Sequence, residues 1–160
     1  QKFHINKAML LARKTYSYQQ DLSVPAFQAG QIFTVMDARC SLCARGATWI
    51  ARHDSKQEFV IIPLQSDVGR ALMLHYGLDP ADPTSWLFVE NGQAFTSLDA
   101  LIRVGWRLGP FWKGLSVLRV LPKSLQDTLY RYVARNRYRF FGTTDLCSLP
   151  DADVQKRLLR

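Results

Sequence analysis

Two cysteines three residues apart are the part of this sequence best suited to chemistry. They belong to the segment Asp37-Ala-Arg-Cys40-Ser-Leu-Cys43. In the first turn of a helix, two residues at this spacing lie close enough for their sulfurs to form a disulfide. The positive end of the helix and the neighbouring Arg39 favour the thiolate, which is the reactive form of cysteine. We therefore expect Cys40, which we take to be the more exposed cysteine, to act as the nucleophile of thiol-disulfide exchange.

Cys43 and Asp37 have supporting roles in this hypothesis. Cys43, one helical turn inward, would attack the mixed disulfide and release the reduced substrate. Asp37 could accept or relay the proton of that step. Capping of the helix, or solvation of the strand end, is an equally good interpretation of Asp37. Exchange of this kind needs no metal and no organic cofactor, so we expect none.

The cysteine pair follows a strand and opens a helix in the predicted secondary structure. Residues 31–36 are rich in β-branched and aromatic side chains, which favours a short buried strand. Apolar side chains recur at helical spacing over residues 40–54. A second strand is predicted over residues 59–64, where Pro63 indicates an end or edge position. The cysteines are thus expected at a junction inside a strand-helix-strand unit.

Turn and capping residues delimit the rest of the chain. The pair Asn91-Gly92 readily takes the positive φ angles of a tight hairpin, so it predicts strands over residues 86–90 and 93–96. Caps and helix breakers delimit further helices. These are a helix from Ser66 or Asp67 to Gly77, one capped by Ser97 that runs to about Leu108, and, after Gly109-Pro110, two over residues 111–121 and 123–140.

The order of these elements is that of the thioredoxin fold. A strand-helix-strand unit gives two parallel strands, and the later hairpin adds an antiparallel pair to the same sheet. We predict an α/β protein with a thioredoxin-like core over residues 31–108. Residues 1–30 are expected to form a basic N-terminal segment and linker, and residues 109–160 a helical extension packed on the core.

Composition places the chain among folded proteins of one domain. It has 160 residues, of which 48% are hydrophobic, which is enough for a core and too many for a disordered chain. Three cysteines are too few for a disulfide scaffold, and no apolar stretch is long enough to span a bilayer. The sequence begins at Gln1, which is compatible with a leader removed upstream. The compartment stays open, with the cytoplasm favoured over a membrane surface or an organelle.

The net charge of +8 comes from the last third of the chain. Residues 101–160 hold 12 basic and 4 acidic side chains, whereas the earlier residues are balanced. Within this part Arg131, Arg135 and Arg139 share one face of a predicted helix. That face is most simply a solvated surface, and the alternative is a docking site for an acidic partner or a membrane surface. Binding of nucleic acid is not expected, because no nucleic-acid motif frames these residues.

Two alternatives to redox chemistry remain for the cysteine pair. It could supply half of a zinc site, for which Cys147, His53 and His75 are candidate partners without a second paired spacing. It could also consist of two structural thiols on a buried helix face. In either case the protein would be a non-catalytic interaction module that works through its basic helices. Haem attachment in its usual form is excluded, because Ala44 stands where a histidine is required.

Several separated blocks between about residues 31 and 150 carry a further signal. They include the DxxCxxC pattern at Asp37, Cys40 and Cys43, and the run RNRYRFFG over residues 135–142. In these blocks the sequence resembles the DCC family of thiol-disulfide oxidoreductases, also called the DUF393 family. The resemblance implies a thioredoxin-like fold. It also implies oxidoreduction of protein or small-molecule disulfides, with another thiol system as the reductant.

The chain departs from the family pattern near the cysteines. Members commonly have Tyr-Asp-Gly where this chain has Met36, Asp37 and Ala38. Without the glycine the turn is more restricted, which changes how closely the backbone can approach a substrate. Thioredoxin-fold enzymes also place a cis proline beside the cysteines, and Pro83 is the nearest candidate. We treat Pro83 as a loop proline.

Overall fold

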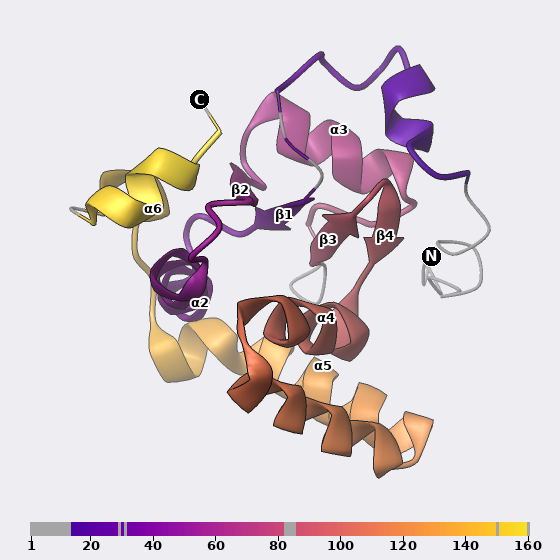
Figure 1. The fold of residues 1–160 in the computed structure, drawn as a ribbon, viewed down its shortest axis with the longest axis vertical. Coiled ribbons are helices and arrows are strands. Elements are labelled where there is room, and N and C mark those ends of the chain that lie inside the picture. Colours follow the sequence, from indigo (N-terminus) through magenta and orange to yellow (C-terminus); the bar gives the residue numbers. More distant parts are fainter. Residues whose placement is uncertain (1–13, 29, 31, 82–85, 150, 160) are drawn as a thin grey trace.

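A four-stranded mixed sheet stands at the centre of the fold (Figure 1). The computed structural model describes residues 14–28, 30, 32–81, 86–149 and 151–159, so Pro83 and residues 1–13 of the predicted N-terminal segment lie outside the described residues. The strands are β1 (Ile32–Met36), β2 (Phe59–Pro63), β3 (Leu87–Glu90) and β4 (Gln93–Phe95). Strand β1 pairs parallel with β2 and antiparallel with β3, which pairs antiparallel with β4. The resulting order, β2-β1-β3-β4, confirms the predicted thioredoxin-like fold.

Helices cover both faces of this sheet. Helix α3 lies on one face, whereas α2 and α4 lie on the other, and α5 lies beyond α4 (Figure 1). In the described residues the α-helices are α2 (Ser41–His53), α3 (Asp67–His75), α4 (Ser97–Leu108), α5 (Lys123–Phe141) and α6 (Ala152–Arg157). The 3₁₀ helices are η1 (Ser17–Gln20), η2 (Pro110–Val120) and η3 (Leu146–Ser148).

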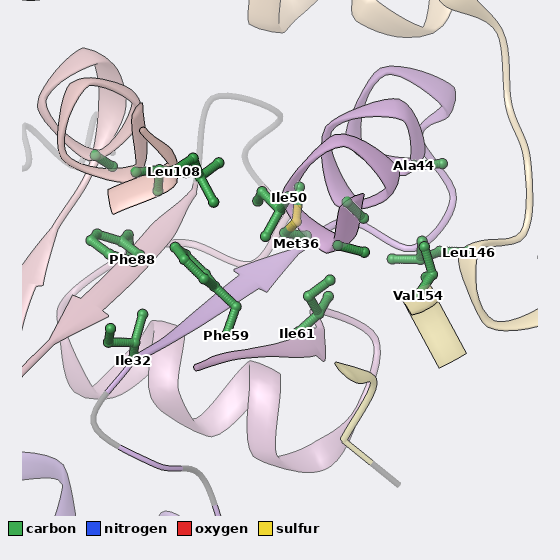
Figure 2. Packing of buried hydrophobic residues seen from close by; sticks show 14 of the residues in the cluster. Ile32, Met36, Ala44, Ile50, Phe59, Ile61, Phe88, Leu108, Leu146 and Val154 are labelled. Carbon is green, nitrogen blue, oxygen red and sulfur yellow. The ribbon is translucent and has the colours of Figure 1, made fainter. Parts of the chain in front are cut away.

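Alternate residues of the strands feed two apolar cores, because successive side chains of a strand point to opposite faces. Figure 2 shows the core on the α2 face, where Ile32, Met36 and Phe88 of the sheet meet Ile50 of α2. The side chains of Leu146 and Val154 close the same core from the C-terminal part of the chain. On the other face, the intervening strand residues Phe33, Val35 and Ile62 pack in one cluster with Leu72 and Met73 of α3 and Tyr18 of η1.

Short-range signals in the sequence give the turns and caps that the structure contains. Asn91 and Gly92 have φ angles of 50° and 78° and join two paired strands as a two-residue hairpin loop. The Ser66 hydroxyl accepts from the Gly69 amide at 3.0 Å and so caps α3, which is followed by Gly77 with a φ of 72°. The predictions for these residues are confirmed.

Some of the predicted elements differ in detail. Ser97 is the first residue of α4 rather than its cap, since Thr96 occupies the capping position without a side-chain bond to the helix. Residues 110–120 form a 3₁₀ helix in place of the predicted helix over 111–121. The predicted linker contains η1, whose Tyr18 is buried in the core beside α3. The predicted boundaries at residues 30 and 108 stay a prediction.

The C-terminal part of the chain is fastened to the edge strand β2. Arg157 of α6 is buried and donates from Nε to Oδ2 of the buried Asp54 at 3.1 Å. The Leu159 amide donates to the carbonyl of Ile61 in β2 at 2.9 Å. The Leu159 bond pairs part of the edge of β2. The Arg157 bond connects α6 to the end of α2, and the two helices lie side by side at the left of Figure 1.

The close approach of α3 to the end of β2 generates a stability prediction. A Cβ atom at Gly69 would stand 2.2 Å from the Pro63 carbonyl oxygen, so Gly69→Ala forces the helix away from the strand. We expect the free energy of unfolding to fall by about 1–3 kcal/mol, as measured by urea denaturation. Gly114→Ala is the matched control, because its Cβ meets no heavy atom within 4 Å. Equal effects of the two substitutions would contradict the close packing.

Candidate active site

The cysteine pair occupies the start of α2, directly after β1 and a short turn. Cys40 is the capping residue of the helix, with a φ of −89° and a ψ of 122°. Its sulfur accepts a hydrogen bond from the Cys43 amide at 3.4 Å. The two side chains therefore lie on the same first turn, as the sequence spacing predicts.

The exposure of the two cysteines is the reverse of the expected one. Cys40 is fully buried, whereas Cys43 is partly exposed. The prediction that Cys40 is the more exposed cysteine is therefore wrong. Its burial has a clear cause in the segment that follows α5.

Residues 142–146 lie across Cys40. Thr143 forms an isolated antiparallel bridge with Cys40. The Ser41 amide donates to the Gly142 carbonyl at 3.3 Å, and further along the Thr144 amide donates to a carbonyl of the turn before Cys40 at 2.9 Å. This backbone pairing covers Cys40, whereas the side chain of Cys43 stays partly exposed.

The environment of the pair separates the two thiol pKa values. A hydrogen bond from the Cys43 side chain is the largest influence that lowers the pKa of Cys40, to about 6. Burial opposes this effect, while backbone amides at the helix start and the charge of Arg137 add to it. The pKa of Cys43 is raised by the hydrogen bond of its thiol to Cys40, by the partial burial of its side chain and by the negative charge of the Cys40 sulfur. Near neutral pH the reduced pair therefore holds a thiolate at Cys40 and a thiol at Cys43.

Asp37, at the end of β1, is a buried carboxylate with several hydrogen-bond donors around it. The donors are the Arg39 amide at 2.9 Å, the Gln65 side-chain amide at 2.7 Å, the Arg137 guanidinium at 2.8 Å and the Tyr138 hydroxyl. Gln65 also accepts from the Ala38 amide at 3.0 Å, so it braces the turn on both sides. The carboxylate thereby joins the turn before the cysteines to α5.

These donors fix the charge state of Asp37. Burial by itself raises the pKa of the carboxyl group, but the bonds from Tyr138, Arg39 and Gln65 and the charge of Arg137 outweigh it, and the pKa is lowered. Tyr138 responds in the opposite sense, since burial and its bond to Asp37 raise the pKa of the phenol to about 12. At neutral pH the cluster therefore consists of a carboxylate, a guanidinium and a neutral phenol.

The sequence did not single out three members of this cluster as site residues. Arg137 and Tyr138 belong to the run over residues 135–142 on which the family resemblance rests, so that run carried a signal for them. Arg137 is buried, and its guanidinium carbon lies 5.1 Å from the centre of the Tyr138 ring. Gln65 follows β2 directly, and no pattern in the sequence distinguishes it.

The other candidate residues lie outside the cluster around Asp37. Arg131, Arg135 and Arg139 have exposed side chains on α5, and a docking role for them stays a prediction. Cys147 is exposed in η3. Among the residues that the structure describes, no group of three or more His, Cys, Asp or Glu side chains is arranged to hold a metal ion. In the same part of the chain, no helix has the length and apolar character needed to cross a bilayer.

Comparisons with known proteins agree on one family. Residues 34–143 match the model of the DCC1-like thiol-disulfide oxidoreductase family. The chain is 32% identical over 125 residues to YuxK, an uncharacterized protein of Bacillus subtilis, and the match covers 78% of this chain and 91% of YuxK. It is 33% identical over 116 residues to a chloroplastic DCC family protein of Arabidopsis thaliana, covering 72% of this chain and 67% of that protein. No solved structure matches.

The contact between Arg137 and Asp37 generates a prediction about reactivity and stability. Arg137→Gln removes a positive charge near Cys40 and leaves Asp37 without its buried cation. We expect the pKa of Cys40 to rise and the free energy of unfolding to fall by about 3–5 kcal/mol. Titration of the isotope-labelled Cys40 Cβ resonance by NMR, in a Cys147→Ser background, measures the pKa. Arg137→Lys, which keeps a cation, should retain more stability.

Arg135→Gln is the control for this experiment, because Arg135 lies on the same helix with an exposed side chain. It should leave the titration midpoint of Cys40 and the stability unchanged. If Arg137→Gln also left the pKa of Cys40 near 6, the guanidinium would have no part in stabilising the thiolate.

A second prediction concerns the pH dependence of stability in the reduced protein. The folded pKa of Cys40 is about 6, whereas an unfolded cysteine has a pKa of about 8.5. Because the folded value is the lower one, the thiolate stabilises the fold fully above the unfolded pKa and loses this effect as pH falls through the folded pKa. Relative to Cys40→Ser, the reduced protein should gain stability between about pH 6 and pH 8.5. If the free energies of unfolding of the two proteins changed in parallel with pH across that window, the lowered pKa would be contradicted.

Proposed function

This chain belongs to the DCC1-like thiol-disulfide oxidoreductase family, and we propose that it carries out two-electron thiol-disulfide exchange through Cys40 and Cys43. The observation that carries the proposal is the arrangement of the two sulfurs on the first turn of α2, with Cys40 at the capping position. A disulfide between residues at this spacing is sterically accessible, and the start of a helix stabilises the thiolate that exchange requires.

The chemistry balances without a cofactor. One sulfur of the reduced pair attacks a substrate disulfide, a mixed disulfide forms and the first substrate thiol leaves with a proton. The other cysteine then attacks the protein sulfur of the mixed disulfide, and the second substrate thiol leaves with a proton. Two electrons pass to the substrate, and the pair becomes the Cys40–Cys43 disulfide. An external thiol system, by the reverse exchange, restores the two thiols.

Asp37 supports this chemistry as a positioning residue in our proposal. Its carboxylate has a lowered pKa and is occupied by donors from three parts of the chain, which makes it a poor proton acceptor. It instead holds the Arg137 guanidinium close to the two sulfurs. The proton transfer that the sequence suggested for Asp37 stays a prediction that no contact here requires.

The proposed exchange can be tested by titrating the thiols of the purified protein in glutathione buffers of graded potential. We expect one two-electron transition, which Cys40→Ser and Cys43→Ser both abolish. Cys147→Ser should leave the transition unchanged, because Cys147 is exposed in η3 and is not part of the first turn of α2. If the pair failed to form a reversible disulfide at any potential, the proposed function would be wrong.

A further inference from the structure

An apolar cavity of about 430 Å³ opens beside the cysteine pair, between α2, α4, η2 and α5. Its walls include the tryptophans Trp49 and Trp86 together with Leu42, Val104, Leu129 and Val133. The ring of Trp86 is fixed by a hydrogen bond from its Nε1 to the Thr34 hydroxyl in β1, at 2.8 Å. This volume and this lining are typical of a site for a small, largely apolar molecule.

Only one of the two cysteines borders this cavity. Cys43 contributes to its wall, whereas Cys40 does not, and the backbone of residues 142–144 covers Cys40 from the other side. A molecule in the cavity therefore reaches the sulfur of Cys43 first. Cys40 stands behind it and retains contact with the Cys43 sulfur.

The polar groups of the cavity are few, and they specify the ligand further. Asp37 and Arg137 both line it, but their charges are paired with one another at 2.8 Å, which favours an uncharged ligand.

From these observations we propose that the cavity binds a small, uncharged, mainly apolar disulfide, and that the substrate is held as a mixed disulfide on Cys43. The proposal rests on the exchange function proposed above and names its substrate class. It also assigns the substrate to the second cysteine, whereas the sequence had suggested the first.

The steps of this exchange follow from the contacts of the pair. The Cys43 thiol passes its proton to the Cys40 thiolate, attacks the bound disulfide and forms the Cys43–substrate bond, while the first substrate thiolate leaves. The Cys40 sulfur loses that proton to the leaving thiolate and then attacks Cys43. The second substrate thiolate departs and takes a proton from water. Two electrons and two protons thus reach the substrate, and the Cys40–Cys43 disulfide remains.

A trapping experiment separates the two cysteines. Each single variant, Cys40→Ser and Cys43→Ser, is prepared with Cys147→Ser and treated with dipyridyl disulfide, which is uncharged and aromatic. Rates are compared per thiolate, from the pH profile of each variant, because Cys40→Ser removes the group that accepts the Cys43 proton. We expect Cys40→Ser to form the pyridyl mixed disulfide on Cys43 several-fold faster per thiolate than Cys43→Ser forms it on Cys40. Mass spectrometry locates the adduct. Equal or faster labelling of Cys40 would overturn the assignment to Cys43, even if the redox titration supported the exchange function.

A second experiment tests the cavity itself. The rate with dipyridyl disulfide is compared with the rate with charged glutathione disulfide, each divided by the rate of a free thiol with the same reagent. We expect the unmodified protein to prefer the apolar reagent several-fold. Val133→Trp places a larger side chain in the cavity wall and should abolish this preference. Leu129→Trp is a second filling variant, because Leu129 also lines the cavity and is exposed enough to accept a larger side chain.

Val117→Trp is the matched control, because Val117 is exposed and does not line the cavity. It should keep the full preference for the apolar reagent. If both filling variants kept the preference, or if the unmodified protein showed none, the cavity would not be the substrate site. A normal redox titration alongside that result would leave the exchange function intact and overturn only the substrate class.

Discussion

A buried ion pair between Asp37 and Arg137 holds the site together. It joins the turn after β1 to α5, which is separated from it by 100 residues of chain. Removal of either partner would leave a charge buried without its counterion, which costs several kcal/mol, so the two elements cannot separate freely. The position of α5 in turn supplies one wall of the apolar cavity and directs residues 142–146 across Cys40. One contact therefore links the fold, the cavity and the covering of the cysteine.

The same ion pair affects both the pKa values and the exposure of the two cysteines. Arg137 adds positive charge to a helix start that already favours a thiolate at Cys40, and the Cys43 thiol donates to that sulfur. The cysteine with the lowered pKa is thus the buried one, and the cysteine with the raised pKa faces the cavity. A low-pKa sulfur is the better leaving group when a thiol attacks the disulfide of the oxidised pair. The exchange proposed at Cys43, with Cys40 as the inner sulfur, would use both features.

Local rules account for most of what the sequence predicted. Asn91-Gly92 fixed the hairpin and Ser66 the start of α3, because positive φ angles and short side-chain caps depend on neighbouring residues only. The exposure of Cys40 could not be predicted in this way, since it depends on a bridge with Thr143, far along the chain. The partners of Asp37 and the cavity likewise arise from tertiary contacts of α5, which amphipathic periodicity does not specify.

The most direct test of this account is the pKa of Cys40 in the reduced, unmodified protein. Titration of the isotope-labelled cysteine Cβ resonances by NMR resolves Cys40 from Cys43 and Cys147 in one experiment. The surroundings of the pair predict a midpoint near pH 6 for Cys40, with Cys43 still protonated at that point. A Cys40 midpoint near the ordinary cysteine value of about 8.5 would contradict it, because the helix start, Cys43 and Arg137 would then not stabilise a thiolate.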